Sequence, residues 1–251
     1  MSLIEVKHLK KYFDTPRGMV HAVDDVTFRI DAGTTMGVVG ESGCGKSTLG
    51  RTMIHLNEST DGEIWFDGKN VTNIKGQELK DFREQVQFIF QDPFSSLNPA
   101  KKISWILEEP LRMQKVPKEE RKKRVLAMAE RVGLSAEHLK RRPHELSGGQ
   151  RQRVSIAAAL IQGSRLILAD EPVSALDVTI QKQIMELLEE LKDTHGLSFI
   201  FICHNLALVQ SFCDKVLVLY DGKVVESGKP DDIINEPKEA YTKKLVDAVF
   251  E

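Results

Sequence analysis

The chain has 251 residues, of which 41% are hydrophobic and 29% are charged, and its formal net charge at pH 7 is −2. This composition is typical of globular proteins, and the small net charge predicts no general attraction to nucleic acid. The three cysteines are scattered and form no C-x-x-C pair, so neither a zinc site nor a disulfide framework is expected.

The apolar runs of the sequence are too short to cross a membrane. Runs such as Leu166 to Ala169 and Phe199 to Cys203 have the length of strands, whereas a transmembrane helix needs roughly 20 mostly apolar residues. The first residues also lack the apolar core of a signal peptide. We therefore expect that any work at a membrane depends on partner proteins.

The first ninety residues are predicted to form strands and one helix. Alternating or continuous apolar residues predict strands over residues 4–9, 26–30, 34–39 and 86–90. The strand over 34–39 leads directly into a glycine-rich loop, after which a helix is expected from Lys46 to about His55. The pair Asp67-Gly68 predicts the turn of a hairpin.

The pattern becomes helical between Asp92 and about Gln162. Helices are predicted most clearly over residues 118–132 and 149–161. We interpret residues 92–162 as a helical subdomain inserted into an α/β core that comprises residues 1–91 and 163–251.

Strands and helices alternate again after this segment. Strands are predicted over residues 165–170 and 198–203, helices over 179–194 and 206–213, a hairpin over 215–228 turning at Asp221-Gly222, and an amphipathic helix over 237–250. This order indicates an α/β fold with a mostly parallel sheet, N-terminal antiparallel strands, and a nucleotide at the carboxyl edge of the sheet.

The segment from Gly40 to Ser47, GESGCGKS, matches the phosphate-binding loop G-x-x-x-x-G-K-[ST], also called Walker A. Glycines allow backbone N–H groups to turn inward and surround phosphate oxygens. Lys46 supplies positive charge at the outer phosphates, and the Ser47 hydroxyl can ligate Mg²⁺. Taken alone, this loop predicts only the binding of a nucleoside triphosphate.

Several further residues are candidates for functional roles, and the evidence for each is stronger when the others are present. Asp170 and Glu171 end a buried strand, where one carboxylate can hold Mg²⁺ and the other can orient a water molecule. A solvated acid is the alternative for Glu171. Gln91 and His204 also follow strands, and each alone is explained as a turn or cap residue. Tyr12 and Phe13 are neighbouring aromatic residues, and without other evidence they are interpreted as packing in the core or on an edge strand.

These elements occur in one order together with LSGGQ (Leu146 to Gln150) and SALD (Ser174 to Asp177), and the set resembles the ATP-binding cassette (ABC) ATPases over essentially the whole chain. The resemblance implies ATP and Mg²⁺ as ligands, Glu171 as catalytic base, His204 as a γ-phosphate contact, and Phe13, or failing it Tyr12, as the aromatic that stacks on adenine. It implies metal contacts by Ser47, Gln91 and Asp170. The implied nucleotide-binding residues are Phe13, Gly40, Ser42, Gly43, Cys44, Gly45, Lys46, Ser47, Thr48, Ser147, Gly148, Gly149, Gln150 and Asp177.

The LSGGQ element predicts a second phosphate-binding surface. Ser147, Gly148 and Gly149 stand at the start of a predicted helix, where backbone N–H groups and the positive dipole end point outward. Two such surfaces are hard to place around one nucleotide in a single compact domain. The resemblance resolves this with a head-to-tail, ATP-dependent dimer of two identical or related subunits, in which Asp177 helps to couple the two sites.

Longer strings resemble the ATPase subunits of oligopeptide, dipeptide and nickel importers, namely GESGCGKST, QDPFSSLNP, RRPHELSGGQRQRV and DEPVSALDVTIQ. This similarity implies transmembrane permease subunits that dock near residues 91–99, an extracytoplasmic substrate-binding protein as an indirect partner, and a peripheral place at the cytoplasmic face of the membrane.

Three further features compare this sequence with that group. EPKEAYTKKLV resembles the group's Pro-x-x-Pro-Tyr-Thr segment, with Ala240 in place of proline. Asn205 departs from the usual aspartate, with little expected catalytic loss. No cysteine follows Cys213, so no iron–sulfur cluster is expected.

Other functions remain as alternatives. The chain resembles soluble ABC ATPases of non-transport assemblies, such as a phosphonate-degrading complex, in length and C-terminal motif. ABC proteins of translation or repair generally have two cassettes or a long coiled-coil insertion, and neither is found in the sequence, which also lacks a basic footprint. A GTPase is disfavoured because no N-K-x-D string occurs. The basic run at residues 121–124 is interpreted as a solvated helix face.

Overall fold

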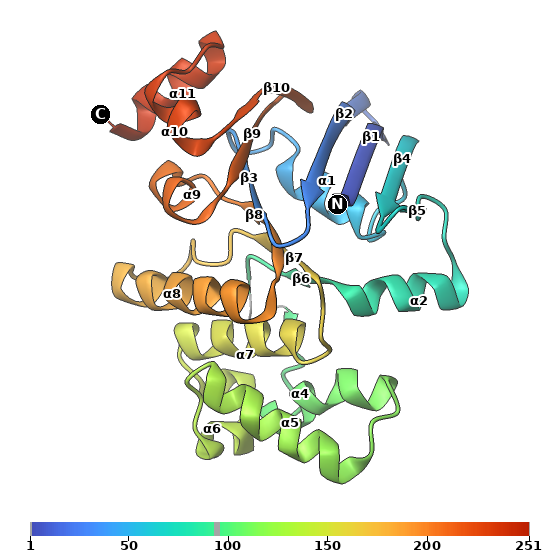
Figure 1. The fold of residues 1–251 in the computed structure, drawn as a ribbon, viewed down its shortest axis with the longest axis vertical. Helices are drawn as coiled ribbons and strands as arrows, with labels where there is room; N and C mark the ends of the chain where they lie inside the picture. Colours follow the sequence, from blue (N-terminus) through green and yellow to red (C-terminus); the bar gives the residue numbers. More distant parts are fainter. Residues whose placement is uncertain (1, 93–95, 251) are drawn as a thin grey trace. The chain divides into compact units, whose positions relative to one another are not determined.

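The structure, a computed structural model, describes residues 2–92 and 96–250. Two compact units make up the chain (Figure 1). The first unit comprises Met1–Arg83 and Gly196–Glu251, and the second comprises Glu84–His195. The candidate residues are divided between the two units.

The N-terminal part of the first unit is an antiparallel sheet in the order β2-β1-β4-β5. Its strands are β1 (Ser2–Thr15), β2 (Gly18–Asp31), β4 (Asp61–Phe66) and β5 (Lys69–Asn70). The predicted strands at 4–9 and 26–30 pair with each other at the end of the hairpin remote from its turn, and β1 and β2 both extend from there toward the turn. The turn between β4 and β5 has Asp67 and Gly68 at φ values of 50° and 75°, which confirms the expected Asp-Gly hairpin turn.

The remainder of the first unit contains strands in the order β10-β9-β3-β8. β3 (Thr35–Val39) pairs in parallel with both β8 (Ser198–Ile202) and β9 (Lys215–Tyr220), while β10 (Lys223–Gly228) is antiparallel to β9. β3 and β8 are buried at every position, which explains their continuous apolar sequence. The described helices that lie wholly in this unit are α1 (Lys46–Met53), α9 (Leu206–Phe212), α10 (Pro230–Asn235) and α11 (Ala240–Phe250), and α2 (Gly76–Gln85) lies mostly in it.

The second unit is mainly helical around a pair of parallel strands, β6 (Val86–Ile89) and β7 (Leu166–Asp170). Its helices are α4 (Ile103–Met113), α5 (Lys118–Arg131), α6 (Ala136–Lys140), the 3-10 turn η1 (Pro143–Glu145), α7 (Gly148–Leu160) and α8 (Val178–His195). All described helices of the expected subdomain, residues 92–162, belong to this unit. The boundaries of that subdomain remain a prediction.

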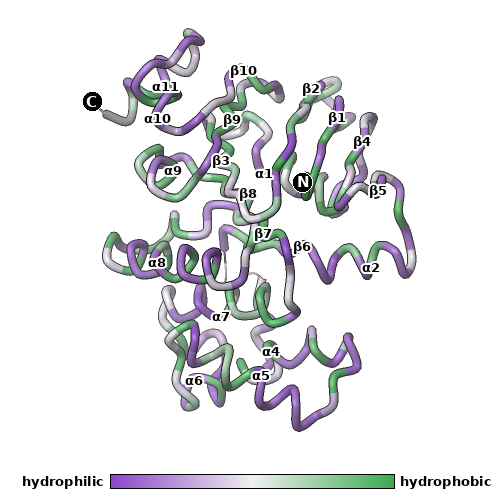
Figure 2. The backbone as a smooth tube through the Cα atoms, in the orientation of Figure 1, coloured by the Kyte–Doolittle hydropathy of each residue, from purple (hydrophilic) through white to green (hydrophobic). Residues whose placement is uncertain are grey.

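The α/β fold class is confirmed, but two helices were not anticipated. α2 (Gly76–Gln85) occupies a stretch where only strands were expected, and α10 precedes the expected C-terminal helix. Phe82 is the one buried residue of α2, and Figure 2 shows this helix as mostly hydrophilic. Such a helix lacks the wide apolar stripe that periodicity detects. α10 has only six residues, too few for a periodic pattern.

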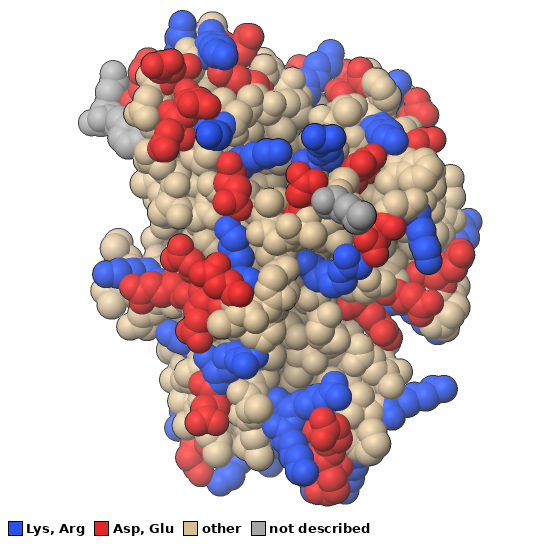
Figure 3. Space-filling view, viewed as in Figure 1, with Lys and Arg blue, Asp and Glu red and all other residues tan. Residues whose placement is uncertain are grey.

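Two surface properties bear on function. On the face drawn in Figure 3, Lys and Arg are interspersed with Asp and Glu. This face therefore presents no broad field of one sign that would attract nucleic acid. Across residues 2–92 and 96–250, no helix combines the length and apolarity required to span a bilayer.

Candidate functional site

The phosphate loop follows the carboxyl end of β3, and two of its glycines are required by its shape. Gly40 and Gly45 have φ values of 147° and 107°. A Cβ atom at Gly40 would lie 2.2 Å from the carbonyl oxygen of Leu219, and one at Gly45 would lie 2.0 Å from that of Ala22. A side chain at either position would therefore displace the loop from the neighbouring backbone.

Gly43 has a different role from these two glycines. Its φ is 84°, yet a Cβ atom there would meet no described atom within 4 Å. The position is open, so a glycine here fits a backbone that a ligand approaches closely. Ser42 beside it is exposed, whereas Cys44 is buried, and this burial raises the pKa of the Cys44 thiol.

Lys46 is only 6% exposed, although it carries a charge. Its Nζ donates hydrogen bonds of 2.8 Å to the carbonyl oxygens of Gly40 and of Glu41. These bonds hold the amine inside the loop. An ammonium group that is buried and held by neutral carbonyls can move to a more favourable anionic partner such as a phosphate.

α1 begins at Lys46 and continues with Ser47 and Thr48 in its first turn. Gly45 at the N-cap has no side chain that could satisfy the N–H groups there, and the first turn contains no acidic residue. The helix N-terminus therefore offers unneutralised dipole charge and backbone donors toward the loop. This is the arrangement expected for phosphate binding.

His204 lies at the same edge of the sheet as the phosphate loop. β3 and β8 are parallel neighbours with Val38 opposite Ile202, and His204 follows two residues after Ile202. Asn205 caps α9, since its side chain accepts hydrogen bonds from the backbone N–H groups of Ala207 and Leu208 at 3.0 and 3.3 Å. Asparagine and aspartate cap helices about equally well, which explains why asparagine is suitable here.

Phe13 and Tyr12 differ in how their rings are engaged. The Tyr12 ring stacks on His21 at 4.0 Å and its hydroxyl donates to Asp24 at 2.5 Å. The hydrogen bond to Asp24 raises the pKa of Tyr12 to about 12. Phe13 is 38% exposed near the turn of the β1–β2 hairpin, where it lies opposite Val20, and Lys11 Nζ is 4.7 Å from its ring centroid. Phe13 is therefore the better placed of the two to stack on a base.

Gln91 and Glu171 are brought together in the second unit. β6 and β7 are parallel with Ile89 opposite Ala169, so the residues after them emerge at one edge. Gln91 Nε2 donates a hydrogen bond of 2.7 Å to a carboxylate oxygen of Glu171. Asp170, the last residue of β7, is 2% exposed.

The LSGGQ segment starts α7 as predicted. Ser147 is the N-cap residue and its Oγ accepts from the Gln150 backbone N–H at 3.3 Å, while the Gln150 side chain accepts from the Ser147 N–H at 3.0 Å. This reciprocal capping box fixes the entry to the helix. Ser147 is exposed, so the capped helix start faces outward.

Asp177 lies where α7 packs on the start of α8. A Cβ atom at Gly149 would be 2.7 Å from Cγ2 of Ile180, so glycine permits the close approach. Asp177 accepts a hydrogen bond of 3.0 Å from the Ile180 backbone N–H and is itself exposed. The LSGGQ segment therefore packs, within one unit, against the start of the helix that follows SALD.

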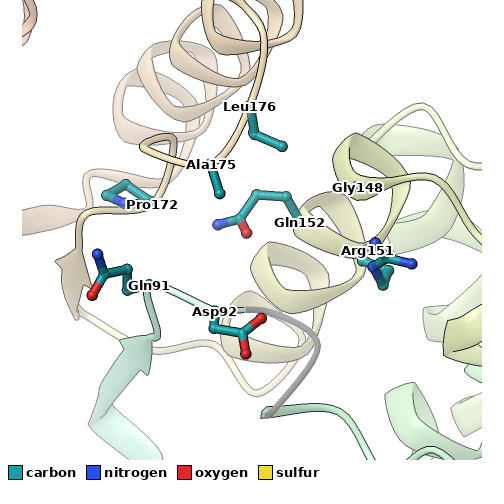
Figure 4. A pocket seen from close by; sticks show the side chains of 8 residues that line it. All are labelled: Gln91, Asp92, Gly148, Arg151, Gln152, Pro172, Ala175 and Leu176. Atoms are coloured by element: carbon teal, nitrogen blue, oxygen red, sulfur yellow. The ribbon is translucent and has the colours of Figure 1, made fainter.

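A small cavity of about 110 Å³ lies between the Gln91 segment and the start of α7, and residues of both line it. Figure 4 shows Gln152 of α7, Ala175 and Leu176 around it, with Gln91 on the opposite side. Gln152 is 1% exposed. Gln91 and the start of α7 therefore line the same cavity.

The residues suggested for Mg²⁺ have suitable chemistry. Mg²⁺ takes oxygen ligands and keeps several waters, so few protein groups are needed. Asp170 supplies a buried carboxylate, Ser47 a hydroxyl and Gln91 an amide oxygen, the Gln91 amide nitrogen being engaged by Glu171. Among the described residues no group of three His, Cys, Asp or Glu side chains could hold a metal ion.

His138 and Tyr241 are among the residues outside the predicted set that contact the motif segments. His138 of α6 lies 3.1 Å from the Gln150 side-chain amide through its Nε2 atom. Tyr241 of α11 accepts a hydrogen bond from the phosphate loop at Glu41 N. Neither contact has a local sequence signal, because the partners are separated by 12 and 200 residues.

The geometry can be compared with known proteins. A model of the ABC transporter family matches residues 23–174. The chain is 50% identical over 250 residues to the oligopeptide transport ATP-binding protein OppF of Bacillus subtilis, covering 98% of this chain and 82% of OppF. It is 44% identical over 253 residues to the dipeptide transport ATP-binding protein DppF of Escherichia coli, covering 98% and 76%.

Two solved structures are also similar. The ATP-binding cassette MJ0796, solved as a dimer in a post-hydrolysis state with ADP and Pi, has a TM-score of 0.82 at 30% identity and covers 90% of this chain and 98% of that one. CbiO1 of Clostridium perfringens, part of the ABC transporter complex CbiONQ, has a TM-score of 0.81 at 31% identity, with 94% and 91% covered.

Proposed function

The chain belongs to the ABC transporter family of ATP-binding proteins, and we propose that it is the ATPase subunit that powers a membrane importer of oligopeptides or dipeptides. The observation that carries the peptide assignment is its 50% identity, over nearly its whole length, to an oligopeptide transport ATP-binding protein. The ATPase assignment has the further support of a phosphate loop and a capped LSGGQ helix in one chain.

Each candidate residue has a role in this proposal. Lys46 and the N–H groups of the phosphate loop bind the triphosphate, and Phe13 stacks on adenine. Ser47, Gln91 and Asp170 hold Mg²⁺, which when bound offsets the phosphate charge. Glu171 orients the attacking water as general base, and His204 contacts the γ-phosphate.

The proposed functional state is a head-to-tail dimer around ATP. The similar cassette MJ0796 was solved as a dimer. In this chain the exposed capped start of α7 is suited to receive the phosphates of a nucleotide held by another subunit. ATP would then join the subunits, and hydrolysis would release them.

The permease is proposed to dock on the second unit. The expected docking segment is residues 91–99, of which Pro93 to Ser95 lie outside the described residues. A groove of about 350 Å³ follows it, lined by Ala100, Lys101, Lys102, Ser104, Trp105, Glu108, Arg112 and Arg142. Four basic side chains against one acid make this groove suitable for an acidic cytoplasmic segment.

The proposal places the chain peripherally at the cytoplasmic face of the membrane, attached through that permease. A substrate-binding protein outside the membrane would then be an indirect partner, and it and the permease would select the peptide. The alternative is an importer of nickel or another small solute, which would have the same kind of ATPase subunit with a different permease and substrate-binding protein.

Replacement of Lys46 by alanine is expected to abolish detectable ATP binding, because no other side chain of the loop supplies a cation to the outer phosphates. Isothermal calorimetry with MgATP measures this directly. Lys123→Ala, at an exposed lysine of α5, is the control for loss of one positive charge. Binding of MgATP by Lys46→Ala at parental affinity would refute the assigned role of the loop.

Affinity purification of the tagged chain from its own cells, in detergent and with ATP present, tests the transport assignment. Recovery of hydrophobic permease subunits together with a second ATP-binding subunit supports it. Recovery of soluble lyase-type subunits without a permease would instead favour the non-transport assembly and reject the importer.

A further inference from the structure

The phosphate loop is held from behind by the C-terminal helix. The hydroxyl of Tyr241, in the first turn of α11, accepts a hydrogen bond of 2.8 Å from the backbone N–H of Glu41. The carbonyl of the same peptide group belongs to Gly40, and it accepts a 2.8 Å bond from Lys46 Nζ. One peptide group at the entry to the loop is therefore fixed on both edges, by Lys46 on one and Tyr241 on the other.

The Tyr241 side chain is itself well supported. Its ring packs on the Tyr220 ring at the end of β9, with centroids 4.3 Å apart. The adjacent turn also contacts the loop, since Gly222 N donates a 3.0 Å bond to the Cys44 carbonyl. Burial raises the pKa of Tyr241, so the group is a neutral hydroxyl at physiological pH. β9, its turn and α11 thus support the same loop.

A carboxylate on β10 anchors the start of this helix. The two oxygens of Glu226 accept bonds from the backbone N–H groups of Lys238 and Glu239 at 3.0 and 3.1 Å. Burial opposes ionisation of Glu226, but its hydrogen-bond donors outweigh this and keep its pKa below the ordinary value. Thr242, next to Tyr241, is fully buried. Charge-assisted bonds and burial therefore hold Tyr241 at the loop.

We propose that Tyr241 is a positioning residue for the nucleotide, and that docking of α11 and binding of ATP stabilise one another. The inference rests on the proposed role of the phosphate loop. When ATP binds, the three N–H donors of Lys46 Nζ are shared between the phosphates and the carbonyls of Gly40 and Glu41. The restraint that Lys46 places on the Gly40–Glu41 peptide group then weakens, while the hydrogen bond from Glu41 N–H to the Tyr241 hydroxyl is unaffected by this change.

Coupling of this kind is reciprocal. If the docked helix favours the loop shape that binds ATP, then ATP must favour the docked helix by the same factor. A hydroxyl with a purely structural role would alter the melting temperature without making the exchange of α11 amides depend on nucleotide. Hydrogen exchange of α11 with and without MgATP therefore separates the two roles.

The test is Tyr241→Phe, which keeps the ring and removes only the hydroxyl. A hydrogen bond of this kind contributes on the order of 1 kcal/mol, so MgATP affinity should fall by about 3- to 10-fold in calorimetry. Tyr220→Phe removes a hydroxyl from the other ring of the pair and should leave the affinity unchanged. Glu226→Gln, which loses the charge that anchors the helix, should weaken MgATP binding in the same direction as Tyr241→Phe.

In the parent protein, MgATP should slow amide exchange within α11, and this protection should be lost in Tyr241→Phe. Parental affinity in Tyr241→Phe, together with α11 exchange that MgATP does not change, would overturn the inference. The parent and Lys46→Ala are measured alongside. If the parent binds MgATP and Lys46→Ala does not, failure of the Tyr241 prediction leaves the proposed function standing, whereas a parent that binds no ATP refutes the function itself.

Discussion

Glu171→Gln is expected to lower ATP turnover by about 10²–10⁴-fold, the usual scale for removing a general base. The substitution should leave the local geometry intact. Gln91 Nε2 donates to a Glu171 carboxylate oxygen at 2.7 Å, and a glutamine at position 171 can present its amide oxygen to the same donor. What is lost is the negative charge that polarises the attacking water, while ATP binding is retained.

Because hydrolysis is what separates the subunits in the proposed cycle, this variant should also accumulate as an ATP-bound dimer, visible by light scattering after gel filtration. A steady-state phosphate-release assay gives the turnover. The matched control is Glu186→Gln, an exposed acid on α8 that lies 3.9 Å from Lys182. Turnover of Glu171→Gln at the parental rate would show that another group is the base.

Ser147→Arg is expected to abolish most ATP turnover without weakening ATP binding to the isolated subunit. Ser147 is exposed and caps α7, so a long side chain there would cover the N–H groups that the proposed dimer offers to the partner's nucleotide. The phosphate loop of the same chain is in the other compact unit and is not altered by the substitution.

The control for this variant must reproduce the loss of the helix cap. Ser147→Ala removes the Oγ acceptor of the Gln150 N–H without adding bulk, and such a loss costs about 0.5–2 kcal/mol of stability. We expect Ser147→Ala to retain far more turnover than Ser147→Arg at a temperature where both are folded by circular dichroism. Turnover in Ser147→Arg equal to that of the parent would reject the shared-site arrangement.

Local sequence was sufficient for the elements whose signals are local. The phosphate-loop glycines, the strand before them and the helix after them were predicted within one or two residues of their observed limits. Both Asp-Gly turns are found where they were expected, because positive φ at two consecutive residues favours that pair. The capped start of α7 follows from Ser147 and Gln150 at capping-box spacing.

Periodicity was insufficient where a helix buries little of itself. α2 was missed because only Phe82 of its ten residues is buried. The preference for Phe13 over Tyr12 came from the resemblance to a family, whereas the contacts of the Tyr12 side chain with His21 and Asp24 across the hairpin are visible only in the structure.

The sequence alone determined which residues can perform the chemistry, because glycine freedom, amine charge, carboxylate basicity and helix capping are properties of a residue and its near neighbours. The tertiary structure decided which hydrogen-bond partners, distant in the sequence, position these residues. The Gln91–Glu171 bond arises from the pairing of β6 with β7, and the Tyr241–Glu41 bond joins residues 200 positions apart. Contacts of this range are selected by the packing of the whole unit, and no local pattern encodes them.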